Sequence, residues 1–98
     1  MAKLTTTKWD PVHHLKTDTE MIAYLDAALE DGDPALVAAA LGDIARAKGM
    51  SKLARKAGLG RESLYKTLSA NGNPEFATIL KVMQALGLRF HTSIVARS

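Results

Sequence analysis

Glycine and proline divide this chain into five short segments. Gly32, Gly49 and Gly87 are of the type that ends a helix, and Gly58-Leu59-Gly60 separates two segments with almost no loop. Within the segments, apolar residues recur every three or four positions, which is the period of an amphipathic helix. This spacing predicts an all-α fold of five helices around one core.

Capping residues mark where the first two helices begin. Thr17 and Glu20 have the spacing of a capping box, and Asp33 followed by Pro34 suits the N-cap and first turn of a second helix. Gly32 and Gly49 end these helices. The apolar residues predicted to face the core are Ile22, Leu25 and Leu29 in the first helix, and Val37, Ala40, Leu41 and Ile44 in the second.

The other three helices are predicted over Ser51–Ala57, from Arg61 to about Ala70, and from Asn73-Pro74 to Gly87. The predicted core face of the last helix is Phe76, Ile79, Leu80, Met83 and Leu86. After Gly87 the sequence LRFHTSIVA alternates between two faces, which predicts a short C-terminal β-strand.

A lone strand is unstable because its backbone donors and acceptors need a partner. One candidate pairing partner is Lys3–Trp9, which is rich in threonine. The other is the same strand of a second copy of the chain. We predict the second arrangement, a homodimer in which Leu88–Val95 pairs with its twofold mate and buries Leu88, Phe90 and Ile94. The chain then divides into a partly flexible N-terminal segment, residues 1–16, and a single domain, residues 17–98.

The composition excludes several kinds of site. The chain has no cysteine, so it has no disulfide and no thiolate metal ligand. His13 and His14 are adjacent and diverge, and no nucleophile has a placed base. We therefore predict no cofactor, no bound metal and no enzymatic activity. Since no apolar run could span a bilayer or serve as a secretory signal, we expect a cytoplasmic protein without a membrane partner.

The charges are separated along the chain, although the formal net charge is only +3. Residues 18–33 hold six acids and no Lys or Arg, whereas residues 46–66 hold seven bases and one acid, Glu62. This polarity predicts one acidic and one basic surface. The acidic surface suits a basic protein partner, or it serves solubility and helix capping.

The basic stretch has the spacing of a helix-turn-helix. Ala54 is small where two helices cross, Gly58 can adopt a left-handed conformation, and Leu59 and Leu64 point into the core. The helix that starts at Arg61 then presents a polar face suited to a DNA major groove. The predicted DNA-binding residues are Ser51, Lys52, Arg55, Arg61, Glu62, Ser63, Tyr65, Lys66 and Asn71.

These residues have different expected roles, each with a structural alternative. Arg61 and Lys66 either contact the DNA groove or form an ordinary solvated face. Glu62 either interacts favourably with the dipole at the helix N-terminus or accepts a hydrogen bond from a cytosine base. Tyr65 is a phosphate contact or a half-buried packing residue. Asn71 is a turn residue first and a backbone contact second.

Residues 24–88 resemble a known family. The segments GDPALV, ARAKGMSKLARKAGL, LYKTLS and GNPEF resemble the addiction-module antidote proteins, which are HigA-like antitoxins with a lambda-repressor-like helix-turn-helix. Two positions depart from related repressors: Thr67 stands where an apolar residue is usual, and Gly60 stands where a capping serine is common.

The resemblance implies an antitoxin that represses its own operon and neutralises a cognate RelE/HigB-like toxin, with operator DNA bound as a homodimer. Two alternatives stay open, namely a free-standing phage-type transcriptional repressor and a protein-interaction module without DNA binding. We expect a five-helix, lambda-repressor-like domain with a short C-terminal strand.

Overall fold

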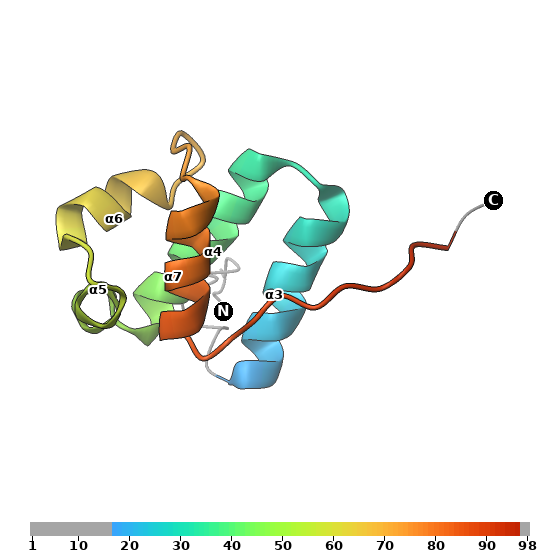
Figure 1. The fold of residues 1–98 in the computed structure, drawn as a ribbon, viewed down its shortest axis with the longest axis horizontal. Helices are drawn as coiled ribbons and strands as arrows, with labels where there is room; N and C mark the ends of the chain where they lie inside the picture. Colours follow the sequence, from blue (N-terminus) through green and yellow to red (C-terminus); the bar gives the residue numbers. More distant parts are fainter. Residues whose placement is uncertain (1–16, 97–98) are drawn as a thin grey trace, which may run out of the picture.

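A computed structural model of the chain describes residues 17–96, and within this range all regular secondary structure is helical. The helices are α3 (Asp18–Asp31), α4 (Pro34–Lys48), α5 (Met50–Ala57), α6 (Arg61–Thr67) and α7 (Phe76–Ala85). Helix α7 lies in front of α4, with α3 on one side and the pair α5 and α6 on the other (Figure 1). The predicted all-α architecture is confirmed.

The predicted caps fix the starts of α3 and α4. The Thr17 hydroxyl accepts from the Glu20 amide at 3.1 Å, and the Glu20 carboxylate accepts from the Thr17 amide at 3.0 Å. This reciprocal capping box satisfies two backbone donors that a helix start leaves free. At the next start, the Asp33 carboxylate accepts from the Ala35 amide at 3.0 Å, with Pro34 in the first turn.

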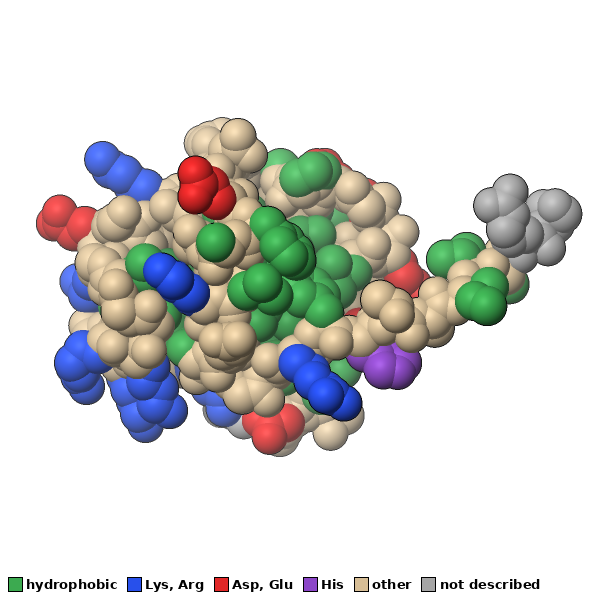
Figure 2. Space-filling model, viewed as in Figure 1, with side chains coloured by type: hydrophobic (Ala, Val, Ile, Leu, Met, Phe, Trp, Pro, Cys, Tyr) green, Lys and Arg blue, Asp and Glu red, His purple; other side chains and the backbone are tan. Residues whose placement is uncertain are grey.

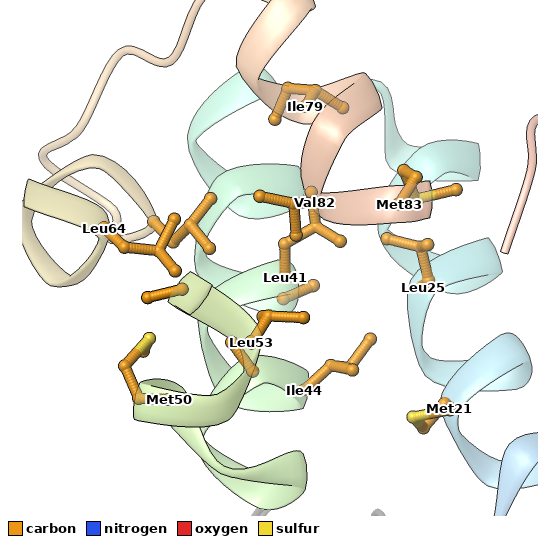
Figure 3. Close-up of a cluster of buried hydrophobic side chains, with 14 of the residues drawn as sticks. Met21, Leu25, Leu41, Ile44, Met50, Leu53, Leu64, Ile79, Val82 and Met83 are labelled. Carbon is orange, nitrogen blue, oxygen red and sulfur yellow. The ribbon is translucent and has the colours of Figure 1, made fainter. Parts of the chain in front are cut away.

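One hydrophobic core joins all five helices (Figure 3). Its most completely buried large side chains come from four of them: Met21, Leu41, Ile44, Leu64, Leu68 and Val82, where Leu68 caps α6. Leu53 and Ala54 add the buried face of α5. No polar or charged residue among those described is fully buried, so apolar packing holds the helices together.

The buried face of α3 differs from the predicted one. Met21, Leu25 and Ala28 are buried, whereas Ile22 and Leu29 are 47% and 38% exposed. Both sets of residues have helical spacing, so the sequence pattern alone does not choose between them. Packing against α4 decides the rotation of α3, and it leaves two large apolar side chains at the surface.

Helices α6 and α7 are each shorter than predicted. Helix α6 ends at Thr67 instead of near Ala70, because Leu68 leaves the helical conformation and Gly72 then packs against the Thr67 carbonyl. Helix α7 begins at Phe76 instead of at Asn73-Pro74. Of its predicted core face, Ile79 and Met83 are buried, Leu80 and Leu86 are half-buried, and Phe76 is 65% exposed, while Val82 is buried in addition.

The segment after α7, which we call the C-terminal tail (Leu88–Ala96), forms no strand within the described chain. The predicted strand is therefore not confirmed, and the alternative partner Lys3–Trp9 lies outside the described residues, as does all of the N-terminal segment. The amides of Gly87 and Leu88 bond to the carbonyls of Gln84 and Met83 at 3.0 and 2.8 Å, which ends α7 in a Schellman motif.

The first residues of the tail lie against the core, and its end does not. Leu88 and Phe90 are half-buried, and the Phe90 ring stacks on Phe76 with a centroid distance of 5.9 Å. Ile94 and Val95 are 96% and 76% exposed, and the tail runs away from the helices past α3 (Figure 1). Three tail side chains were expected to be buried. Leu88 and Phe90 pack against the core of the same chain, whereas Ile94 does not contact that core.

Candidate nucleic-acid interface

Helix α5 is strongly amphipathic and lies with one face on the core. Met50, Leu53 and Ala54 are buried, and the opposite face exposes Ser51, Lys52, Arg55 and Lys56. Ala54 is 3% exposed, as expected for a small residue at a point where two helices cross closely. Helix α5 thus presents a basic face to the surface.

A left-handed glycine makes the turn between α5 and α6. Gly58 has φ +72°, a conformation that costs side-chain-bearing residues about 1–2 kcal/mol. Its amide donates to the Arg55 carbonyl at 3.2 Å, and the Leu59 amide donates to the Ala54 carbonyl at 2.9 Å. These are the two bonds of a Schellman motif, and half-buried Leu59 packs against the core beneath it. The predicted tight turn is confirmed.

Helix α6 presents a polar face that follows from its two buried leucines. Leu64 and Leu68 are each 1% exposed, and Arg61, Glu62, Tyr65 and Lys66 are exposed as predicted. Ser63, expected near the boundary of this face, is exposed as well. The Arg61 guanidinium lies 5.1 Å from the centroid of the Tyr65 ring, and Tyr65 is 39% exposed. Tyr65 can therefore hold the Arg61 guanidinium in place on the helix surface.

The two positions that depart from related repressors have visible consequences. Gly60 is the N-cap of α6, and no side chain bonds to the first amides of this helix. Thr67 is half-buried, so the helix keeps its packing through Leu68 instead. The first amides of α6 therefore lack the side-chain acceptor that a capping serine would provide.

A close backbone contact holds the end of α6 on α4. Gly42 is buried in α4, and a Cβ at this position would lie 2.1 Å from the Leu68 carbonyl oxygen. Only a residue without a side chain permits this approach. Gly42 is thus a determinant of where α6 sits.

The exposed bases gather at the end of the molecule formed by α5 and α6 (Figure 2). Lys52, Arg55, Arg61 and Lys66 are exposed there, and within residues 17–96 no ion pair engages them. Glu62 is exposed in the first turn of α6, where the helix dipole favours an acid. A surface of this charge attracts polyanions such as DNA.

Some basic residues at this end are not among the predicted DNA-binding residues. Lys56 and Lys81 line one depression between α5 and α7, and Lys48, Lys52 and Lys56 line a second one beside it. Lys81 is separated from α5 in the sequence, and its neighbours in α7 are apolar, so no local signal connects it to the basic stretch. Lys48 and Lys56 stand in the basic stretch and could have been included from charge alone.

Asn71 lies in the loop that follows α6. Its side chain is exposed, and the loop folds back on the helix through a bond from the Gly72 amide to the Ser69 carbonyl at 2.9 Å. The Ser69 hydroxyl donates to the Lys66 carbonyl at 2.9 Å. These bonds satisfy carbonyls at the helix end and support the expected role of Asn71 as a turn residue.

A polar cluster links α3 to α4 behind this interface. The Tyr24 hydroxyl donates to the Asp43 carboxylate at 2.5 Å, and Arg46 forms an ion pair with the same carboxylate. Burial, together with the hydrogen bond and the charge of Asp43, raises the pKa of Tyr24 to about 12. The cluster fixes α3 on α4 and is separate from the basic end.

The described chain offers no metal site and no membrane span. Residues 17–96 contain no cluster of three or more His, Asp or Glu side chains that could hold a metal ion, and His13 and His14 lie outside that range. None of the helices described is long and apolar enough to cross a membrane.

Comparisons with known proteins assign the chain to a family. A family model described as probable addiction module antidote protein matches residues 5–94. An uncharacterized protein from Haemophilus influenzae is 51% identical over 82 residues, which cover 84% of each chain. No solved structure matches.

Proposed function

Because this chain belongs to the family of probable addiction module antidote proteins, we propose that it is the antitoxin of a type II toxin–antitoxin module. In this proposal it binds operator DNA as a homodimer, represses its own operon and neutralises a RelE/HigB-like toxin in the cytoplasm. It performs no catalysis itself. The family match over residues 5–94 is the observation that carries the antitoxin role.

The α5–α6 surface supports the DNA-binding part of the proposal. Two short helices meet at the Gly58 turn, and α6 exposes Arg61, Ser63 and Lys66 on the side opposite its buried leucines. Arginine can bond a guanine edge with two hydrogen bonds, whereas lysines on α5 suit backbone phosphates. We therefore assign α6 as the recognition helix of a lambda-repressor-like helix-turn-helix, with α5 as its supporting helix.

The acidic surface supports a basic protein partner. Asp26, Glu30, Asp31 and Asp33 are exposed on α3 and at its end, and α3 lies on the opposite side of α7 from α5 and α6 (Figure 1). A toxin that cleaves RNA needs a cationic substrate surface, so an acidic antitoxin face would attract it. The separation of the two surfaces would allow DNA and toxin to bind at the same time.

A gel-shift titration tests the DNA-binding proposal, with duplex from the region upstream of this chain's own gene and a scrambled duplex of the same length. Arg61→Ala should weaken binding to the upstream duplex by about 1–3 kcal/mol and leave the scrambled duplex nearly unaffected. Lys52→Ala should weaken both equally and reduce the salt dependence. Glu30→Gln, an exposed charge on α3 outside α5, α6 and the tail, is the control and should change neither.

Co-expression with the neighbouring reading frame tests the antitoxin role. If the neighbour encodes a small protein that arrests growth alone and not together with this chain, the antitoxin proposal is supported. Upstream DNA binding without such a neighbour would indicate a free-standing phage-type repressor. Rescue of growth without any DNA binding would leave a protein-interaction module.

A further inference from the structure

Beyond Leu88, the C-terminal tail has no backbone hydrogen-bond partner within residues 17–96. No backbone–backbone hydrogen bond joins residues 89–96 to any other described residue. Its last apolar side chains, Ile94 and Val95, are almost fully exposed. A segment with unpaired donors and alternating side chains is a template for pairing with another strand.

An apolar groove lies open where the tail leaves the core. Its volume is about 320 Å³, and it is lined by apolar side chains from three helices and the tail. These include Leu29, Val37, Phe76, Ile79 and Phe90. Phe76 is 65% exposed at its edge, and Figure 2 shows the hydrophobic surface between α7 and α3. Exposed aromatic surface of this kind marks an interface.

We propose that the tail pairs antiparallel with the tail of a second copy, centred on Thr92, and that Ile94 of the partner subunit packs into this groove. The proposal rests on the twofold operator binding proposed above, which requires two copies of α6. It deepens that proposal by naming the surface, the register and the side chain that enters the groove.

The tail residues that face the core show which side chains share one face of the proposed ribbon. Leu88 and Phe90 are half-buried and Arg89 and His91 are exposed, which is the alternation of a strand with one face on the core. The same face then carries Thr92 and Ile94. A twofold axis at Thr92 places Phe90 and Ile94, the two large apolar residues of this face beyond Leu88, opposite each other across the ribbon.

Cross-strand neighbours in this register are compatible. Phe90 lies opposite Ile94 of the partner subunit, an aromatic and β-branched pair of the kind that stabilises sheets. Arg89 lies opposite Val95 of the partner subunit, so no like charges face each other directly. A two-stranded ribbon alone is marginal, but Phe76 and Phe90 provide a hydrophobic face for it to pack on.

The arrangement leaves the basic surface free. The tail runs past α3 on one side of α7, whereas α5 and α6 lie on the other side (Figure 1). The groove is lined by residues of α3, α4, α7, the loop before α7 and the tail, and by no residue of α5 or α6. Dimerisation through the tail therefore keeps both recognition helices accessible. An interface made by α5 or α6 would cover them.

Point variants at the end of the tail test the interface, because Ile94 and Val95 are 96% and 76% exposed and contact little within residues 17–96. In sedimentation velocity we expect the full chain to be dimeric at tens of micromolar. Ile94→Asp should weaken the dimer by roughly tenfold or more, since its carboxylate would be buried in the apolar groove. Val95→Asp is the matched control and should remain dimeric, because Val95 is on the outer face.

Cysteine cross-linking tests the register, and the chain has no cysteine of its own to interfere. Thr92→Cys should form a disulfide-linked dimer under mild oxidation, because residues on the axis lie directly opposite their own mates, closer than any other pair of identical positions in the ribbon. Ser93→Cys should cross-link much less.

A monomeric full chain would overturn the proposal, and so would Ile94→Asp that remains as dimeric as the unaltered chain. Equal cross-linking at positions 92 and 93 would overturn the register. Gel shifts with the upstream duplex separate this inference from the proposed function. A monomer that still binds the duplex would contradict the proposed interface only. A dimer that does not bind the duplex would contradict the DNA-binding proposal only.

Discussion

Gly42→Ala tests the contact that places the recognition helix. A Cβ at position 42 would lie 2.1 Å from the Leu68 carbonyl oxygen and 3.1 Å from the carbonyl carbon, whereas ordinary contact begins at 3.4 Å. The obstacle is backbone, so no side-chain rotation can relieve the overlap. Either α4 or the end of α6 must withdraw by about 1 Å, which loosens the packing of Leu64 and Leu68.

Two opposing effects set the size of the change. Overpacking a well-packed site costs about 1–3 kcal/mol, and the upper half applies because rigid backbone is the contact. Alanine is favoured over glycine within a helix by about 0.5–1 kcal/mol. The free energy of unfolding should therefore fall by roughly 1–2.5 kcal/mol. Without the close contact, the substitution would instead stabilise the protein.

Urea denaturation followed by circular dichroism measures this difference, at one protein concentration for all variants because of the proposed dimerisation. The control is Ala39→Gly, the reverse exchange at a half-buried position of the same helix. It measures the contribution of helix propensity and should lower the free energy of unfolding by about 0.5–1 kcal/mol. A Gly42→Ala protein as stable as the unaltered chain, or more so, would refute the close approach of α6 to α4.

Two further predictions concern the other parts of the molecule. The raised pKa of Tyr24, about 12, means that its protonated form stabilises the fold. This stability is fully present below the unfolded-state pKa of about 10 and is lost as the pH rises towards 12, so an alkaline titration of stability should show a drop of about 1–2 kcal/mol that Tyr24→Phe largely removes. Equal drops in both proteins would contradict the assignment. On the acidic side, Asp26→Lys with Asp31→Lys should slow toxin association in stopped-flow measurements, most strongly at low salt, while operator affinity stays nearly unchanged. Salt-independent, unaltered association rates would rule out electrostatic steering by α3.

Local chemistry in the sequence determined where most helices begin and end. The Thr17 and Glu20 capping box, the Asp33-Pro34 start and the Gly58 turn each depend on residues within a few positions of one another. Such interactions form whatever the rest of the chain does, so they can be predicted without a fold. The exposure of Arg61 and its neighbours followed from Leu64 and Leu68 in the same way.

Tertiary packing decided what local patterns left open. The rotation of α3 that buries Met21 in place of Ile22 depends on the shape of α4, and the early end of α6 depends on the loop that packs on it. Lys81 joins the basic end because α7 packs beside α5. The C-terminal strand was predicted from alternation, but a strand is defined by its partner, and residues 17–96 of one chain supply none. The spacing of apolar residues predicts that each helix or strand has a buried face. Which way that face turns, and which element packs against it, depends on the tertiary structure.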